Sequence, residues 1–199
     1  QGYGKELDQL TNPRIDMLSI SGHKIFAPKG IGALIARKRD GSFPALQPLV
    51  YGGGQEQGLR AGTLPVPLIV GLGEAAKLAL REQPKRHETC VAFREEVCAM
   101  LANFDAKQNG AEEYTLPHCI NISFPGISSA QAIKTLKDVV AVSSTSACPS
   151  HTQAPSHVLH AMGLPASRVE SSLRLSWCHM TPQVDWDGVG AILRNLRKT

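Results

Sequence analysis

The sequence predicts a mixed α/β chain in two parts, residues 1–80 and residues 81–199. Two observations predict this arrangement. Short β-branched segments bounded by glycine lie near the N-terminus and are followed by a stretch of helical composition. From His118 onward, strands and helices alternate in the order β-α-β-α-β-α, which is typical of a small α+β or α/β domain. One small domain, preceded by part of another, is therefore expected.

The pattern places the elements of each part in order. In the first part they are strands over residues 15–20 and 31–36, a loop over 40–65 and a helix over 67–81. In the second part they are a helix over 85–104 after the break at Pro84, a polar bend over 105–117, a strand over 119–124, a helix over 128–137, a strand over 139–143, a helix over 156–162, a strand over 173–177 and a helix over 181–197. Ser128 and Gln131 have the spacing of a capping box, and Thr181–Pro182 that of a helix start.

The composition is that of a folded globular protein and argues against several classes of function. Hydrophobic residues make up 42% of the chain and charged residues 19%, so disorder is not expected. The net charge of +4 comes from scattered residues, which gives no support to direct nucleic-acid binding. No run approaches the roughly 20 apolar residues of a membrane span. Because the first residue is Gln1 rather than Met, the chain is expected to be cut, processed or only part of a longer protein.

The cysteines favour a reducing compartment, and the cytoplasm is the expected location. Five are present without any CxxC spacing, so neither a disulfide framework nor a zinc ribbon is predicted. They are Cys90, Cys98, Cys119, Cys148 and Cys178.

A lysine follows the first predicted strand in the tetrapeptide Ser21-Gly22-His23-Lys24. A lysine that attacks an aldehyde must be neutral, which requires partial desolvation or cationic neighbours. The serine and histidine beside it are able to donate hydrogen bonds to a phosphate. By spacing alone, a solvated lysine beside a turn stays an equally simple interpretation.

A glycine-rich segment, GGGQEQGLRAGT, runs from Gly52 to Thr63. Its backbone N–H groups and the threonine hydroxyl are suited to an anion. The spacing is neither that of a P-loop nor that of a dinucleotide fingerprint, so a flexible loop stays open as an alternative.

Cys148 lies in a small, polar segment, SSTSACPSH, over residues 143–151. A thiol on such a loop is free to react, although the thiolate form needs nearby cationic groups. Two other interpretations are open, an unreactive loop residue and a zinc ligand. The zinc spacings match no common module; the ligands would come from Cys148, His151, His157, His160, Cys178 and His179.

Arg174 stands within an otherwise apolar strand. A guanidinium is costly there unless it meets an anion, and its planar fork suits a carboxylate. An internal salt bridge is the alternative.

These four segments occur in the order found in one family. With SGHKIFAPKGIGAL around the lysine, the chain resembles the C-terminal half of a group I cysteine desulfurase, a class V aminotransferase-like enzyme of fold type I that depends on pyridoxal phosphate. The resemblance implies that residues 1–80 end the large cofactor-binding domain. It also implies that residues 81–199 form the small C-terminal domain with the catalytic cysteine loop.

The resemblance assigns cofactor residues. Lys24 corresponds to the lysine that binds the cofactor covalently, Ser21 and His23 to its phosphate ligands, and Gln1 to the glutamine at the ring hydroxyl. Thr63 corresponds to a threonine that reaches the phosphate of the neighbouring subunit, which implies a homodimer. The N-terminal half of the site, with its ring-stacking histidine, is absent from the chain.

The resemblance also assigns the substrate residues. Arg174 corresponds to the arginine that binds the carboxylate of L-cysteine, and Cys148 to the thiol that takes the sulfur as a persulfide and leaves L-alanine. Thr145 replaces the usual glycine before that thiol. Trp177-Cys178-His179 stand where many members have Gly and Arg, so the pocket rim is expected to differ.

The implied activity is therefore that of a cysteine desulfurase that passes sulfur to an acceptor protein, either a scaffold or a thiolation enzyme. Three destinations stay open, namely iron–sulfur clusters, tRNA thiolation and DNA phosphorothioate modification. The alternatives are a non-catalytic fragment that binds partners and another class V enzyme, such as a selenocysteine lyase. Cys148 argues against an aminotransferase, because transamination needs no such thiol.

Overall fold

The computed structural model describes residues 1–144 and 156–197, and the chain divides into two compact units, Gln1–Pro84 and Lys85–Thr199. Each unit has its own hydrophobic core. Within the described ranges, no helix combines the length and the apolar character that crossing a membrane would require.

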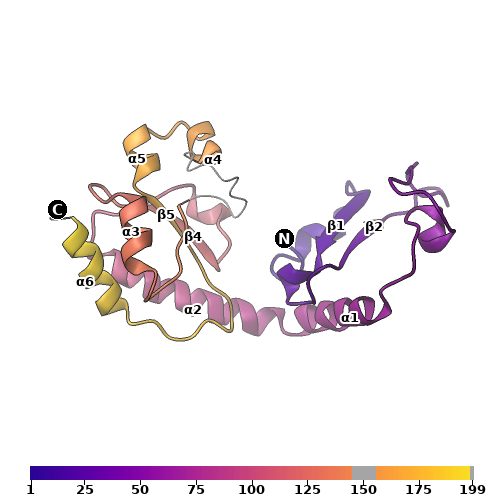
Figure 1. Cartoon of the computed structure of the whole chain (residues 1–199), viewed down its shortest axis with the longest axis horizontal. Coiled ribbons are helices and arrows are strands. Elements are labelled where there is room, and N and C mark those ends of the chain that lie inside the picture. Colours follow the sequence, from indigo (N-terminus) through magenta and orange to yellow (C-terminus); the bar gives the residue numbers. More distant parts are fainter. Residues whose placement is uncertain (145–155, 198–199) are drawn as a thin grey trace. The chain divides into compact units, whose positions relative to one another are not determined.

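The first unit is built on an antiparallel hairpin (Figure 1). Strand β1 (Met17–Ser21) pairs with β2 (Gly32–Ala36), and Ser21 lies opposite Gly32. These strands confirm the two predicted segments within a residue or two. Gly32 has no room for a side chain, because a Cβ there would lie 2.5 Å from the carbonyl oxygen of Ile20.

Helix α1 (Val66–Arg81) holds the chain that follows β1. Its small residues Ala75 and Ala79 are buried with Ile25 and Ala27 in a compact core. A Cβ on Gly71 of α1 would lie 2.9 Å from the ring of Pro28, so the helix packs closely against this segment. The lysine segment therefore packs against α1. In addition to the turn at the lysine, this unit contains two short 3-10 turns, η1 (Asp8–Thr11) and η3 (Gln55–Gly58).

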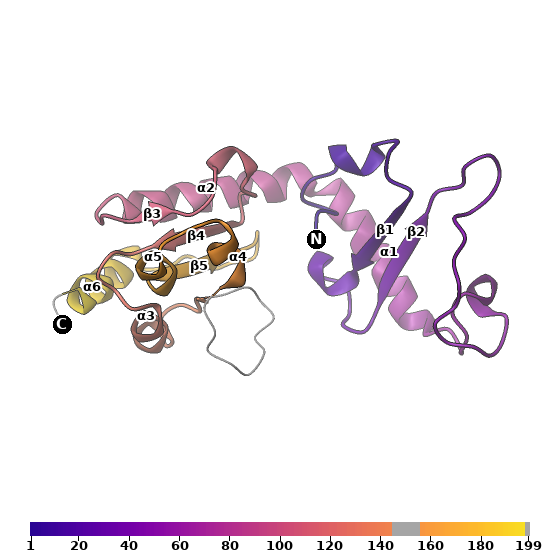
Figure 2. The same ribbon diagram turned by 90° about the horizontal axis from the view of Figure 1, so that it is seen from above.

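The second unit is a three-stranded antiparallel sheet with helices (Figure 2). The strand order is β3 (Lys107–Gln108), β4 (Cys119–Ser123) and β5 (Ser172–Ser176). The helices of this unit are α2 (Gln83–Leu101, which begins just before the boundary), α3 (Ser129–Leu136), α4 (His157–Ala161), α5 (Ala166–Glu170) and α6 (Trp186–Leu196), with a 3-10 turn η4 (Glu112–Tyr114).

One face of this sheet is apolar and the other is polar. Apolar residues of β4 and β5 pack with α2, α3 and α6 into one core; they include Ile120, Ile122, Leu173, Leu175, Val97, Leu136 and Leu193. Phe93 of α2 joins the core to the aromatic rings of Trp177 and Trp186, at centroid distances of 5.4 Å and 5.6 Å. In Figure 1 the strands lie between α2 on one side and α4 and α5 on the other. The alternate residues of the strands, which are polar, are thereby turned away from this core.

Two of the predicted elements are wrong, and local hydrogen bonds explain both. Residues 139–142 form no strand, because the N–H groups of Val139 and Val140 donate to the carbonyl oxygen of Leu136 at the end of α3; only Ser143 bridges to β5. The last helix begins at Trp186 and not at residue 181. Thr181 Oγ1 instead accepts from the Cys178 N–H in a turn, and Asp185 caps the helix through Gly188.

Smaller differences concern short elements. Helix α3 forms where it is predicted, but Ser128 makes no side-chain capping bond, so the predicted capping box is absent. The short elements β3 and α5 have too few residues for a visible period in the sequence. The predicted strand at 173–177 and helix at 156–162 are confirmed as β5 and α4.

Candidate active-site residues

The lysine turn is shaped by a glycine that has no space around it. Ser21 ends β1, and the 3-10 turn η2 (Gly22–Ile25) carries His23 and Lys24. A Cβ on Gly22 would lie 2.8 Å from the carbonyl oxygen of Ile31, and the Gly22 N–H donates to that same oxygen at 2.9 Å. Because Gly22 is pressed inward, the residues on either side of it are exposed, and these are the predicted site residues.

The backbone nitrogen of Gln1 lies close to Lys24 and Lys5. Lys5 also donates from Nζ to the backbone oxygen of Lys24 at 3.4 Å. The structure thus brings Gln1, Lys5 and Lys24 together, and the positive charges of the two lysines favour an anionic ligand.

The glycine-rich segment folds back on itself through a short 3-10 turn. Glu56 and Gln57 both have left-handed backbone conformations, with φ of 52° and 59°, which non-glycine residues adopt at a cost. The Gln55 Oε1 accepts from the Gly62 N–H at 3.2 Å and ties the two ends of the segment together. Thr63 is the residue after Gly62, and it is exposed. A defined backbone therefore presents the predicted phosphate ligand.

Arg174 lies in the middle of β5, on the polar face of the sheet. Its side chain is half-buried, and its Nε is buried without a hydrogen-bond partner. Among the described residues its guanidinium enters no ion pair, so these ranges contain no acceptor for the internal salt bridge that was the alternative. An arginine in this state is available to an external anion.

The predicted sulfur-carrying residue, Cys148, lies outside the described residues, as do Thr145 and His151. The other four cysteines form no disulfide bond among the described residues: Cys90 is buried in α2, Cys98 is exposed, and Cys119 and Cys178 are half-buried. Within residues 1–144 and 156–197, no three His, Cys, Asp or Glu side chains are grouped as metal ligands.

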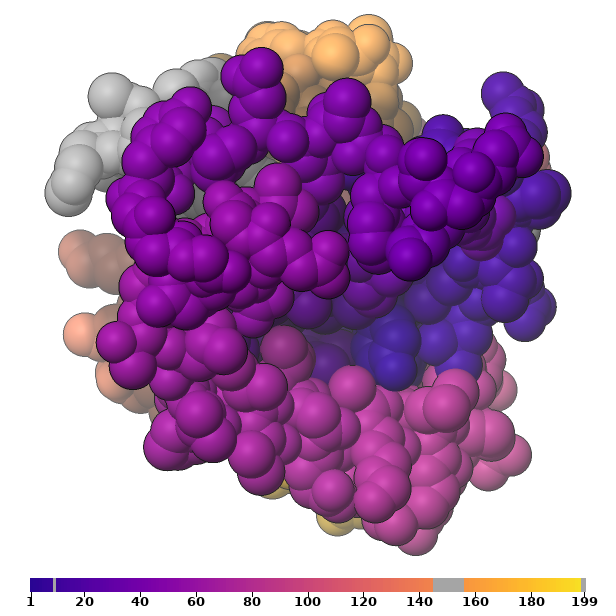
Figure 3. Space-filling model, turned by 90° about the vertical axis from the view of Figure 1, so that its right-hand side faces the viewer, coloured from indigo at the N-terminus to yellow at the C-terminus, as the bar shows by residue number. Residues whose placement is uncertain are grey.

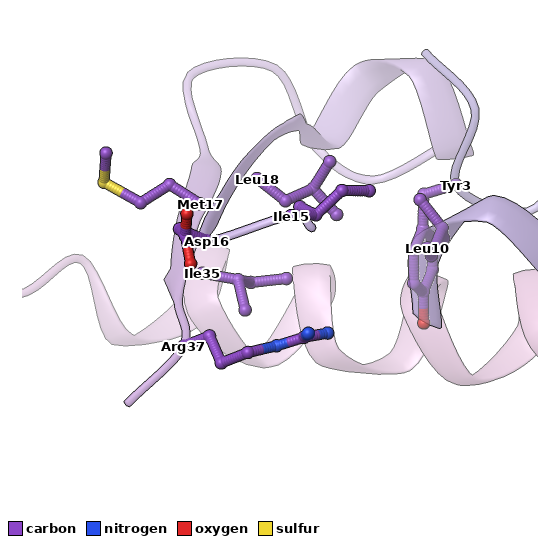
Figure 4. Close-up of a pocket in the computed structure, with 8 residues that line it drawn as sticks. All are labelled: Tyr3, Leu10, Ile15, Asp16, Met17, Leu18, Ile35 and Arg37. Carbon is purple, nitrogen blue, oxygen red and sulfur yellow. The ribbon is translucent and has the colours of Figure 1, made fainter. Parts of the chain in front are cut away.

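A shallow hollow of about 170 Å³ lies on the first unit, but it contains none of the predicted residues (Figure 4). Tyr3 and Leu10 stand on one side of it, across from Leu18 and Ile35 of the hairpin. Its lining is mostly apolar, and its acidic residue Asp16 is paired with Arg39. The hollow offers no nucleophile, and its basic residue Arg37 lies away from the predicted site residues in the sequence.

The comparisons with known proteins now add to this geometry. The family model described as Aminotransferase class-V matches residues 1–189. The chain belongs to the aminotransferase class-V family. Within that family, this class-V chain is 40% identical over 190 residues to the mitochondrial cysteine desulfurase of Eremothecium gossypii, covering 95% of this chain and 38% of that relative.

Two solved structures are similar to this class-V chain. DndA from Streptomyces lividans has a TM-score of 0.74 and 44% identity, covering 89% of this chain and 50% of that one. A structure described as SspA in complex with cysteine has a TM-score of 0.63 and 36% identity, covering 81% and 44% of the two chains. The class-V chain therefore spans about half or less of the proteins that it matches.

One polar residue on the sheet was not predicted from the sequence. Asn121 of β4 lies directly opposite Arg174 of β5 in the strand register. In the sequence it is only the polar position of an alternating strand, and the pairing that brings it to Arg174 joins residues 53 positions apart. Strand register was the information that the sequence lacked.

Proposed function

We propose that the protein containing this chain is a pyridoxal-phosphate-dependent cysteine desulfurase, which converts L-cysteine to L-alanine and holds the sulfur as a persulfide on Cys148. The observation that carries the proposal is the lysine turn, where the inward Gly22 exposes Ser21, His23 and Lys24 together. Relatives that are named cysteine desulfurase match almost the whole of the chain.

The residues present fit pyridoxal phosphate. Lys24 supplies a primary amine from a turn backed by α1, with Lys5 and Gln1 beside it. Ser21, His23 and Thr63 supply exposed hydroxyl and imidazole donors for a phosphate, and Gln1 an amide for the ring hydroxyl. When bound, the cofactor supplies a ring that withdraws negative charge from the substrate carbon atoms.

In the proposed reaction Lys24 and Arg174 have separate tasks. The Arg174 guanidinium holds the substrate carboxylate through charge-assisted hydrogen bonds and so fixes the orientation of the amino acid. The Lys24 amine removes the proton from the α carbon of the substrate and later returns protons to it.

The sulfur step belongs to Cys148. Its thiolate attacks the sulfur atom of the substrate, so that an S–S bond forms as the C–S bond of the substrate breaks. The electron pair of that C–S bond stays with the substrate carbon, which takes up a proton to become the methyl group of L-alanine. The persulfide on Cys148 then passes to an acceptor protein, a scaffold or a thiolation enzyme. The related SspA structure is a complex with cysteine, which supports this substrate.

We further propose that the protein is a homodimer in which Thr63 contributes to the site of the neighbouring subunit. The loop between β2 and α1, in purple at the front of Figure 3, supports this proposal. It exposes three consecutive apolar residues just before the glycine-rich segment: Leu49, which is 96% exposed, Val50 and Tyr51. An apolar patch of this kind is typical of a protein interface. Cytoplasmic location and delivery of sulfur to iron–sulfur clusters stay predictions.

Two variants of the full-length protein test the proposal. We expect Lys24→Ala to abolish both the visible absorbance of the lysine-bound cofactor and the release of sulfide from L-cysteine. We expect Cys148→Ser to keep the absorbance and to lose the protein-bound persulfide. Retention of both signals by Lys24→Ala would refute the cofactor assignment, and a persulfide that survives Cys148→Ser would refute the thiol assignment.

The same experiment separates the alternatives. A selenocysteine lyase would release selenide from L-selenocysteine but no sulfide from L-cysteine. A non-catalytic, partner-binding protein would show neither product, and its absorbance would not change when L-cysteine is added.

A further inference from the structure

Asn121 and Arg174 form a closely spaced side-chain pair. Hydrogen bonds join Trp177 to His118 and Phe124 to Ser171 across β4 and β5, so in this register Asn121 and Arg174 are a non-hydrogen-bonded pair. Side chains of such a pair share one face of the sheet, with Cβ atoms about 5 Å apart. The backbone of Arg174 bonds to Ser143 on its other edge, as this register requires.

The amide group of Asn121 is held in one orientation by buried neighbours. Asn109 Nδ2 donates to Asn121 Oδ1 at 2.7 Å and also to the hydroxyls of Ser123 and Ser172. These two serines are 1% and 0% exposed, and their Oγ atoms lie 3.0 Å from each other. Ser172 in turn donates to the backbone oxygen of Arg168 at 2.7 Å. Asn109, Ser123 and Ser172 are buried, which makes the geometry of the network hard to change.

Because Asn109 occupies the oxygen of Asn121, the amide nitrogen of Asn121 is left to face other partners. Among the described residues Asn121 Nδ2 donates to none, and it belongs to a half-buried side chain. Next to it stands Arg174, whose Nε also lacks a partner. Two adjacent residues on the polar face thus offer donors only, and a carboxylate offers acceptors only.

We propose that Asn121 is a second substrate-binding residue, whose Nδ2 donates a hydrogen bond to the carboxylate of the amino-acid substrate beside the Arg174 guanidinium. The inference rests on the proposed function, since it takes Arg174 as the carboxylate ligand. A carboxylate has about four lone-pair sites, so a bidentate arginine leaves room for a further donor. The network behind Asn121 holds that donor in place before the substrate arrives.

The test compares Asn121→Ala, Asn121→Ser and Asn121→Asp in the full-length, cofactor-loaded enzyme. We expect Asn121→Ala to raise KM for L-cysteine by roughly 10- to 100-fold, because a hydrogen bond to a charged group is lost. Asn121→Ser restores a donor and is expected to recover part of this loss. Asn121→Asp places a negative charge against the carboxylate and is expected to raise KM most.

Cysteamine, which has the amine and thiol of cysteine but no carboxylate, provides the control ligand. Its inhibition constant is expected to be the same for Asn121→Ala and for the unchanged enzyme. An equal loss of affinity for both ligands would overturn the proposal in favour of general distortion. A KM for Asn121→Asp that matches the unchanged enzyme would also overturn it, since the group would then act as an acceptor toward Arg174.

The design separates this inference from the proposed function. The absorbance of the lysine-bound cofactor checks that each variant is loaded, and Arg174→Ala reports on the arginine alone. If Arg174→Ala leaves KM unchanged, the carboxylate site itself is misplaced. If Arg174→Ala raises KM and Asn121→Ala does not, only the role of Asn121 is refuted.

Discussion

Arg174 and Ser143 are joined by a pair of backbone hydrogen bonds, with the Arg174 N–H donating to Ser143 at 2.5 Å and the Ser143 N–H donating back at 3.2 Å. Ser143 begins the segment that leads to Cys148. The proposed carboxylate ligand and the start of the proposed sulfur-carrying segment therefore share one fixed register.

Ser143→Pro should slow sulfur transfer without affecting cofactor binding. Proline has no N–H, so the Arg174 carbonyl loses its donor and the pairing weakens. We expect the rate of persulfide formation in single-turnover experiments to fall about 5-fold, since one hydrogen bond contributes about 1 kcal/mol. Ser143→Ala keeps both backbone bonds and serves as the control. An unchanged rate in the proline variant would show that the bridge has no role in sulfur transfer.

Gly22→Ala should destabilise the lysine turn. The new Cβ would lie 2.8 Å from the Ile31 oxygen, which is backbone and cannot move away cheaply. We expect the free energy of unfolding in denaturant to fall by about 1–3 kcal/mol. The matched control is Gly73→Ala on α1, where no atom lies within 4 Å of the new Cβ; there the higher helix propensity of alanine should add up to about 1 kcal/mol. Equal effects of the two changes would contradict this account.

Asn109→Ala should lower the free energy of unfolding, because Asn109 is at the centre of the buried polar network. Removal of the Asn109 amide leaves the buried hydroxyls of Ser123 and Ser172 with fewer hydrogen-bond partners. We expect a loss of about 1–3 kcal/mol in unfolding free energy. Asn103→Ala, at an exposed position just after α2, should change it by no more than about 0.5 kcal/mol. A network that contributed nothing would make the two variants indistinguishable.

Leu49→Asp should weaken the proposed homodimer. The change places a charge on the most exposed apolar side chain of the loop before the glycine-rich segment. We expect the dimer dissociation constant, measured by sedimentation equilibrium, to rise at least 10-fold, as for a charge placed in an apolar interface. Tyr114→Asp, at an 86% exposed position in the second unit, is the control and should leave dimerisation unchanged. A dimer unaffected by Leu49→Asp would place the interface elsewhere.

The sequence predicted best those elements that depend on local pattern. Strands β1, β4 and β5 alternate or carry β-branched residues, and the lysine turn follows β1 as expected. The run at residues 139–142 has the same local character, yet α3 uses its amides. Local pattern does not show which acceptor an amide finds, so this prediction failed.

The part of the candidate site that escaped prediction depends on distant partners. Arg174 is conspicuous in the sequence because a charge interrupts an apolar strand. Asn121 is inconspicuous, because an asparagine at an outward strand position is ordinary. Its importance follows from its cross-strand partner and from Asn109, and neither relationship leaves a signal in a single sequence.

The two faces of the three-stranded sheet differ in how they tolerate substitution. The face of Ile120, Ile122 and Leu173 is filled by three helices, so nearly every change there costs folding energy. The opposite face carries residues such as Ser176, which is exposed and can be replaced without opening a cavity. Substitutions at such exposed positions can therefore change what this face presents to solvent while the scaffold stays the same.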